Sequence, residues 1–283
     1  MEDTVRHSRV AVSGLGPSNT PGIVQIDRHL SQLNRRLYRQ GRTYTVKVDL
    51  DAGAVTGTNY QVYTLANTWM LKKAWQLAKE EYDDEMMEVA KTFKGKTARW
   101  RDFRLDLNPA YTGALALDTH LIDVNGNEVP LLSGEYIPST VRDDAGASFT
   151  WGIENGSANR FNILTEFDRA GRADTDPEIP QASVAYDQLN TDIQDGDVLE
   201  ITGNGNEPPY AQNNSNGSNP LTYVGELYSD SFGQKLSTGY FDAPLGLVII
   251  VGTAVHKLSG NTELTVVCKK GDYKGVHATS LME

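Results

Sequence analysis

Cysteine is almost missing from this chain: its 283 residues include only one, Cys268. A single cysteine forms no internal disulfide, which excludes the small disulfide-stapled scaffolds of secreted domains. No basic and then apolar leader opens the sequence, so we expect no export through a signal peptide. A chain of this length buries a sizeable core without cross-links. We therefore expect an intracellular or virion setting.

Long hydrophobic runs are missing as well. The longest strongly apolar stretch, PLGLVIIVGTAV at 244–255, is too short and too interrupted by glycine to cross a bilayer. It is instead typical of a buried strand. The sequence therefore predicts a soluble protein with a buried strand here and no membrane partner.

The motifs of known catalytic and metal sites are also lacking. No two histidines stand at metal-ligand spacing, the five being His7, His29, His120, His256 and His277. No G-x-S-x-G elbow and no G-x-x-x-x-G-K-[ST] phosphate loop occurs. We therefore expect no catalytic residue, no metal ligand and no cofactor.

Three acidic residues, Asp174, Asp176 and Glu178, alternate along the stretch ADTDPEIP. A solvated loop is the simpler interpretation of this composition. A hard cation held between subunits is the alternative, because such ions take oxygen ligands and often sit at shared surfaces. Both interpretations stay open.

Charge is unevenly spread along the chain. The sequence has 26 basic and 37 acidic residues, a net charge of −11. Residues 1–47 hold eight basic and three acidic residues, a net charge of +5, which leaves −16 for the remainder. A basic end on an acidic body is typical of a protein whose one end meets a polyanion. A merely solvated terminus is the alternative.

The basic end, residues 1–41, is predicted to be an arm outside the core. Residues 1–22 are rich in Gly, Pro, Ser and Asn without a sustained period, which favours a flexible segment. Ile26 and Leu30 begin a helical spacing that ends at Gly41, so a short basic amphipathic helix should follow. The predicted nucleic-acid contacts are Arg6, Arg9, Arg28, Arg35, Arg36, Arg39 and Arg42.

The body, residues 42–283, shows the pattern of strands and turns. Asn125-Gly126 between two apolar runs is a strong hairpin signal. Further strands are expected near 114–124, 128–137, 147–153, 160–168, 182–189, 197–202, 221–229, 244–255 and 262–269. Many short strands favour a mainly β, antiparallel sandwich or barrel. The polar segment 203–220 is expected to be an exposed loop.

One long helix interrupts the strands at about 67–94. Asn67 or Thr68 is placed to cap it, and apolar residues recur at intervals of three and four. We expect this stripe to dock on an open end or flank of the sandwich, anchored by Trp75 and Tyr82. The predicted docking residues are Leu71, Trp75, Ala78, Tyr82, Met86 and Val89. The acidic face should meet solvent or a neighbouring subunit.

Arginines surround Trp100 in the stretch ARWRDFRL. Arg99, Arg101 and Arg104 beside an aromatic residue are typical of sites that bind phosphates and stack on bases. The simpler interpretation is a strand whose aromatic residues pack inward while its arginines face outward. On a shell protein both interpretations can hold.

The stretches RTYTVKVDL, YQVYTLANTWMLKKAWQLAKEEYDDEMMEVAKT and ARWRDFRL resemble the front half of capsid proteins from small icosahedral viruses, notably circular single-stranded DNA viruses. The resemblance implies a jelly roll of two antiparallel sheets, with an N-terminal arm that points inward to the genome. It also implies a non-enzymatic protein of the virion that is assembled inside the host cell. Its partners would be many copies of itself and the viral genome, bound without sequence preference.

Two other classes of protein share this sandwich expectation. A carbohydrate-binding, lectin-like jelly roll would use exposed aromatic residues such as Tyr210 and Tyr223. A β-sandwich enzyme acting on glycans needs two facing carboxylates, and such a pair can come from distant strands. Particle formation separates the capsid interpretation from both alternatives.

Overall fold

Antiparallel sheets make up most of the structure, which confirms the prediction of a mainly β chain with few helices. The structure is a computed structural model, and it describes residues 4–11, 22–50, 58–92, 100–107, 117–118, 120–122, 125, 127–129, 136–142, 148–153, 160–167, 221–230, 233–252 and 263–282. Among these residues, two pairs of strands are parallel, β2 with β5 and β9 with β10. The other paired strands are antiparallel.

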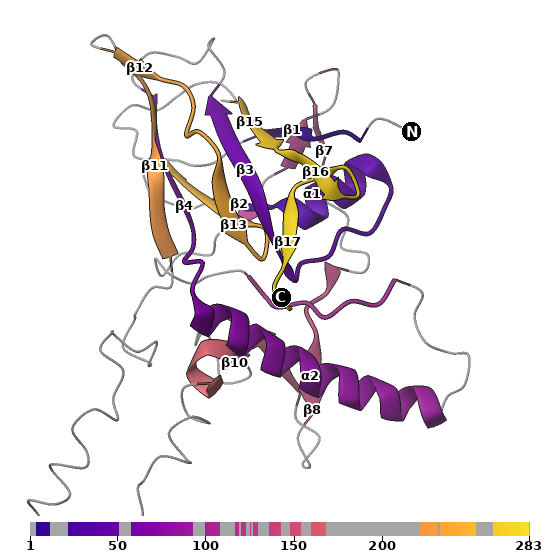
Figure 1. Cartoon of the computed structure of the whole chain (residues 1–283). Coiled ribbons are helices and arrows are strands. Elements are labelled where there is room, and N and C mark those ends of the chain that lie inside the picture. The colour runs from indigo at the N-terminus through magenta and orange to yellow at the C-terminus, as the bar shows by residue number, and fades with distance from the viewer. Residues whose placement is uncertain are drawn as a thin grey trace, which may run out of the picture.

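Eight strands form the body. The first of them in the sequence pairs with the last, the second with the second-to-last, and so on. They are β1 (His7–Ala11), β2 (Gly22–Gln25), β3 (Arg42–Leu50), β4 (Thr58–Leu65), β11 (Leu221–Asp230), β13 (Phe241–Pro244), β14 (Leu247–Gly252) and β15 (Glu263–Cys268). β1 pairs with β15, β2 with β14, β3 with β13 and β4 with β11. The first sheet has the order β13-β3-β15-β1, and the second has the order β11-β4-β14-β2 (Figure 1).

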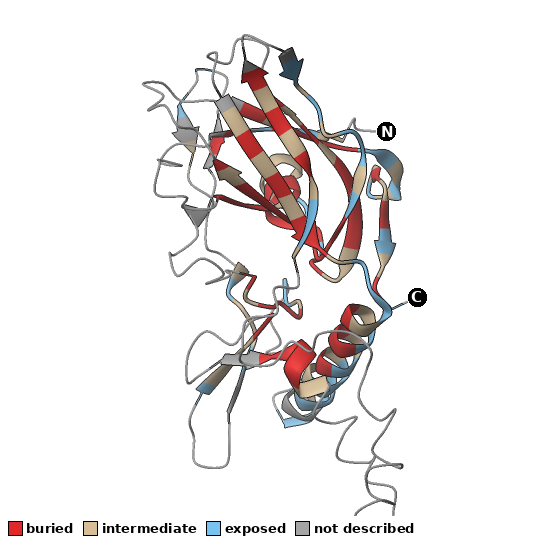
Figure 2. Cartoon of the chain, turned by 90° about the vertical axis from the view of Figure 1, so that its left-hand side faces the viewer, coloured by how far each residue is buried: buried red, intermediate tan, exposed pale blue. Residues whose placement is uncertain are grey.

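The main core lies between these two sheets. Val46 and Val48 of β3 meet Val62 of β4 and Val248 of β14 in one apolar cluster, each of them fully buried. Figure 2 shows buried bands interrupted by intermediate ones along several strands of the sandwich. Along β14 the neighbour Ile249 belongs to a second cluster. Buried side chains on both faces confirm that this apolar run is a buried strand.

Helix α2 (Trp69–Thr92) covers one end of the sandwich (Figure 1). The hydroxyl of Thr68 accepts a hydrogen bond from the backbone N–H of Leu71 at 3.2 Å, which caps the first turn. Leu71, Trp75 and Ala78 are buried in the second cluster, together with residues of the segment 100–107. The first half of the helix is therefore the docked half.

The second half of α2 is more exposed. Tyr82 is half-buried, and its ring centroid lies 5.3 Å from that of Phe103. Met86 is half-buried, whereas Met87 is 55% exposed. The side chain of Val89, another predicted docking residue, lies outside the described residues. Of the two predicted anchors, Trp75 is the one that is fully enclosed.

Shorter strands, with one exception, extend the two sheets or form a small third one. They are β5 (Leu117–Asp118), β6 (His120–Ile122), β7 (Glu128–Val129), β8 (Thr140–Arg142), β9 (Ser148–Gly152), β10 (Arg160–Asn162), β12 (Gly233–Lys235), β16 (Lys270–Tyr273) and β17 (Ala278–Ser280). The exception is β16, which among the described residues makes only isolated bridges to Val276. β6 and β7 pair on either side of the predicted turn. The strand expected over 160–168 is partly wrong, because β10 ends at Asn162 and residues 163–167 are helical.

The prediction of an arm over residues 1–41 is wrong for the residues that the structure describes. β1 pairs with both β15 and β6, and Val10 is fully buried. α1 (Ile26–Asn34) contributes Ile26 and Leu30 to the main core. The physical reason is that β15 needs a partner along its free edge, and β1 supplies it from the other end of the chain.

Some predictions fall on residues that the structure does not describe. These are the strands expected near 182–189 and 197–202, the loop 203–220, the acidic residues Asp174, Asp176 and Glu178, and Arg99 and Tyr210. Within the described ranges, no helix has the length and apolar character to cross a membrane. Over the same ranges, no three His, Cys, Asp or Glu side chains gather where they could hold a metal ion.

Candidate nucleic-acid interface

The structure divides the seven predicted arginines among three places. Arg9 lies on β1 and is exposed, and Arg6, directly before this strand, is half-buried. Arg28 lies in α1, is only 9% exposed, and has its guanidinium carbon 5.4 Å from the ring centroid of Tyr136. Arg28 is therefore an interior residue, and its prediction as a nucleic-acid contact is wrong. The remaining four follow α1 in the sequence.

Five cations form what we call the basic ridge: Arg35, Arg36, Arg39, Arg42 and Lys274. Arg35 ends α1 in the left-handed conformation, with φ of 51°, so the chain turns sharply before β3. Lys274, in the turn after β16, is also left-handed, with φ of 50°. The ammonium of Lys274 donates to the carbonyl of Leu37, which joins the two turns. The ridge thus combines residues from both ends of the sequence.

Two tyrosines, Tyr38 and Tyr273, contact residues of the basic ridge. The guanidinium carbon of Arg42 lies 3.6 Å from the ring centroid of Tyr273, in cation–π contact. The hydroxyl of Tyr38 donates to the carbonyl of Lys274 at 2.9 Å. Burial, followed by the charges of Arg39 and Arg42, lowers the pKa of Lys274. The contributions of Arg39 and Arg42 show that these cations lie close to Lys274, and the carboxylate of Asp102 acts in the opposite direction.

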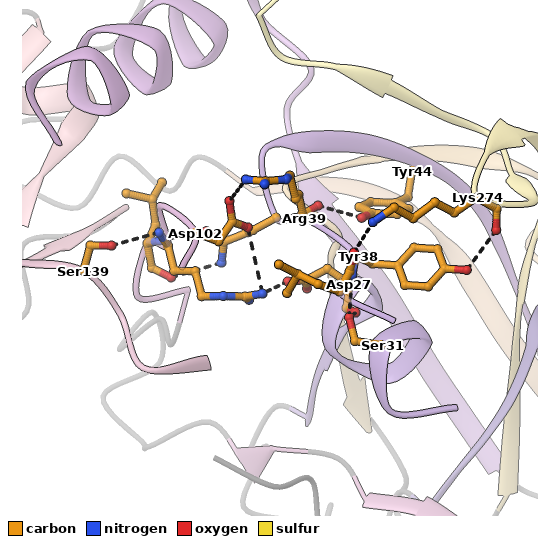
Figure 3. A network of polar contacts seen from close by, with 12 residues as sticks. Asp27, Ser31, Tyr38, Arg39, Tyr44, Asp102, Ser139 and Lys274 are labelled. Atoms are coloured by element: carbon orange, nitrogen blue, oxygen red, sulfur yellow. Dashed lines mark hydrogen bonds and ion pairs between the residues drawn. The ribbon is translucent and has the colours of Figure 1, made fainter. Parts of the chain in front are cut away.

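A buried ion pair lies behind the ridge. Arg104 Nη1 donates to Asp27 Oδ2 at 2.8 Å, and the two side chains are 2% and 0% exposed. Burial raises the pKa of Asp27, against the lowering effect of the Arg104 charge. Asp102 accepts from Arg39 Nη1 at 2.7 Å and lies 4.0 Å from Arg104 Nη2 (Figure 3). The expectation that Arg104 faces outward is therefore wrong, because its charge is matched inside.

This network ties together three segments that are distant in the sequence. Arg104 N donates to Ser139 Oγ at 3.0 Å, which fixes the segment 136–142. Gln40 donates to the carbonyl of Leu105 at 3.1 Å and accepts from its N–H at 2.7 Å. Paired bonds of this type hold backbone segments in register. The end of α1 and the segments 100–107 and 136–142 therefore form one rigid corner.

An open pocket of about 210 Å³ lies at this corner. The described residues that line it are Ser31, Arg35, Arg36, Leu37, Trp100 and Tyr136, and none of these carries a carboxylate. Trp100 is 47% exposed, whereas its neighbours Phe103 and Leu105 are each 2% exposed. Cationic and aromatic side chains around one opening suit a ligand that has both a negative charge and a flat apolar ring.

Sequence reasoning missed three parts of this site: Lys274, Tyr136 and the Asp27–Arg104 pair. Lys274 lies 236 residues after Tyr38, so no local pattern links them. Tyr136 has a ring centroid 4.3 Å from the Arg104 guanidinium carbon, again across a long stretch of sequence. The clustering of arginines around Trp100 was the one available signal. Compared with family models, with curated proteins and with solved structures, the chain matches none of them.

Proposed function

We propose that the chain is a viral capsid protein, whose body is a jelly roll that assembles with copies of itself around nucleic acid. The strand pairing is the observation that carries this proposal. A jelly roll is a double-sheet fold of eight strands arranged as two Greek keys, common in viral capsids and lectins. The pairing of first with eighth, second with seventh, third with sixth and fourth with fifth strand supports that topology.

The long connection between β4 and β11 also supports a shell subunit. It carries α2 and places this helix at one end of the sandwich. Three large apolar side chains of the helix remain exposed: Trp69 is 61%, Leu77 41% and Met87 55% exposed. Tryptophan and methionine are enriched at protein interfaces. We propose that this side of α2 contacts a neighbouring copy, with no catalytic step assigned to the protein.

The basic ridge supports binding of the packaged nucleic acid, in place of the free arm that the sequence suggested. Each phosphate that a cation neutralises releases counterions, so binding depends strongly on salt and little on sequence. A few cations per subunit suffice, because many subunits act together on one polymer. The localisation we propose is accordingly the virion, assembled inside the host cell.

Sedimentation and nuclease challenge of the purified full-length protein test this proposal. We expect fast-sedimenting particles that contain nuclease-resistant nucleic acid. Changing Arg35, Arg36 and Arg42 together to glutamine should lower the nucleic-acid content, whereas Lys73→Gln and Lys91→Gln on α2 should not. A protein that stays monomeric, or particles whose nucleic-acid content ignores the ridge, would refute the proposal.

A carbohydrate-binding function is the second candidate, because one aromatic pair is exposed on the second sheet. Tyr223 of β11 lies opposite Tyr63 of β4, with ring centroids 5.6 Å apart, and is 52% exposed. Exposed aromatic faces of this kind can stack on sugar rings. Glycan-array binding that is lost in Tyr223→Ala, by a protein that forms no particles, would favour this candidate over the capsid proposal.

A further inference from the structure

We infer that the pocket at the corner of α1 holds one unpaired nucleotide of a single-stranded nucleic acid. The base lies against Trp100, and the adjoining phosphate is bound by Arg35 and Arg36. This inference rests on the proposed function and deepens it, since it names single-stranded nucleic acid as the polymer that the ridge meets. The feature that all such single strands share is a flat base next to a phosphate.

Trp100 supplies the stacking surface. Its indole is 47% exposed although the segment that carries it is firmly anchored. Two residues further on, Asp102 is ion-paired with Arg39, and the next residues enter the core. An anchored but exposed tryptophan is preorganised, so little conformational entropy is lost when a base stacks on it. Base–aromatic stacking contributes about 1–3 kcal/mol per base.

Arg35 and Arg36 supply the anion contact. Left-handed backbone costs a non-glycine residue about 1–2 kcal/mol, so glycine is the usual residue where a helix ends this way. Of the three non-glycine residues with positive φ in the described part of the chain, two are Arg35 and Lys274 of the ridge. A cation in the left-handed conformation at a helix end, where glycine is the usual residue, is consistent with a functional role for its side chain.

The form of the pocket distinguishes single strands from duplexes. Its volume of about 210 Å³ admits a single base in part, and the pocket is open, so the rest of the nucleic-acid strand can continue outside it. In a duplex both faces of each base are already stacked, so only an unpaired base can lie on Trp100. Among the described lining residues, the neutral hydroxyls are those of Ser31 and Tyr136, and the Ser31 hydroxyl already donates to the carbonyl of Asp27, so base-edge recognition is limited. Binding should therefore tolerate any sequence.

Fluorescence anisotropy of the full-length protein with labelled oligonucleotides tests the inference. The probes are a short oligothymidylate, an oligouridylate of equal length and a duplex of equal length, each titrated at several salt concentrations. Trp100→Leu should weaken single-strand binding about 5- to 150-fold and leave duplex binding unchanged. Trp100→Phe should restore much of the lost affinity, and Tyr240→Leu, at an exposed aromatic residue outside the pocket, should have no effect.

The same titrations test the phosphate contact, and they test whether the ligand is a polymer or a free nucleotide. Arg35→Gln with Arg36→Gln should weaken binding and reduce the salt dependence by about 0.7 in log–log slope per lost contact. Deoxyribose and ribose probes should bind alike in the pocket. Free adenosine monophosphate should compete only weakly, because it lacks the neighbouring phosphates that the ridge binds. Strong competition by the mononucleotide would overturn the assignment of a polymer.

The outcomes for this pocket and for the capsid proposal are separable. If Trp100→Leu binds single strands as the unchanged protein does, the pocket assignment is wrong, even if nuclease-resistant particles still form. If single-strand binding depends on Trp100 but no particles form, the pocket assignment stands and the capsid proposal falls. Equal loss of single-strand and duplex binding in Trp100→Leu would also overturn base stacking.

Discussion

Arg104 lies in the interior with its Nη1 atom 2.8 Å from Asp27 Oδ2, and neither side chain reaches solvent to any useful degree. Asp27 belongs to α1 and Arg104 to the segment that carries Trp100, so this single pair joins the core to the wall of the pocket. Both partners depend on each other, because a buried charge without its counterion is strongly unfavourable.

Replacement of one partner should therefore lower the free energy of unfolding more than replacement of both partners. We expect Arg104→Met to lower the free energy of unfolding by about 3–5 kcal/mol, since it leaves Asp27 buried without a cation. The double variant with Asp27→Leu should recover much of this loss. Urea unfolding monitored by circular dichroism measures both, with the exposed Arg101→Met as the control. A cost no larger than that of Arg101→Met would contradict the pairing.

His29 makes stability depend on pH. Burial, helped by the charge of Arg28, lowers the pKa of His29 to about 3, and neither ring nitrogen has a hydrogen-bond partner within the described residues. The unfolded chain binds this proton below its ordinary pKa of 6.5, but the folded chain does not until about 3. Stability is therefore complete above 6.5 and falls as the pH drops from 6.5 toward 3.

The expected size of this effect is about 2 kcal/mol between pH 7 and pH 5, at about 1.4 kcal/mol per unit of pH. His29→Phe keeps an apolar ring in place and removes the titration. Denaturant unfolding at the two pH values should show the variant losing about 2 kcal/mol less than the unchanged protein. An identical loss in both proteins would mean that His29 titrates normally and is not buried as described.

Docking of α2 depends on Gly41, whose position allows Trp75 to lie flat against the backbone. A Cβ atom at residue 41 would come within 2.1 Å of Trp75 Cζ2. We expect Gly41→Ala to lower the free energy of unfolding by about 1–3 kcal/mol through this overlap. In a Trp75→Leu background the same change should cost clearly less, because the smaller side chain leaves room. A thermal-unfolding double-mutant cycle measures the coupling, and strict additivity would argue against the contact.

Some of this structure follows from short-range pattern, and some does not. The antiparallel β character and the buried strand at β14 are predictable, because alternation and apolar runs are local properties. β1 is not predictable in the same way. It has five residues with a central arginine, and it becomes a strand because β15, more than 250 residues later, lies beside it. Tertiary pairing here overrides a composition that favours disorder.

The candidate nucleic-acid interface likewise combines features that local sequence pattern predicts with features that it does not. Arginines after α1 are evident in the sequence, but their roles depend on where the helix ends. The spacing of Ile26 and Leu30 suggested a helix up to Gly41, whereas α1 ends at Asn34 and places Arg35 and Arg36 at the pocket. Arg28, about two turns earlier, is inside the protein instead. Burial of Arg104 depends on Asp27, a contact that no local pattern encodes.

The reactivity of the Cys268 thiol can measure whether β1 is paired with β15. Its side chain is 4% exposed, and its backbone N–H donates to the carbonyl of Arg6 at 2.9 Å. Burial raises its pKa to about 12, so the reactive thiolate is scarce. We expect no reaction with a thiol reagent in the folded protein. Removal of residues 1–11 should make the thiol reactive, whereas removal of residues 1–3 should not. Full protection after the longer truncation would show that β1 is dispensable.

Cryo-electron microscopy of the assembled full-length protein tests the central claim most directly. We predict closed shells made of this chain alone, in which each subunit is a two-sheet sandwich and the basic ridge faces the lumen beside nucleic-acid density. Protein that remains monomeric or forms only small oligomers across a range of salt and pH, or a shell whose ridge faces outward, would contradict the account.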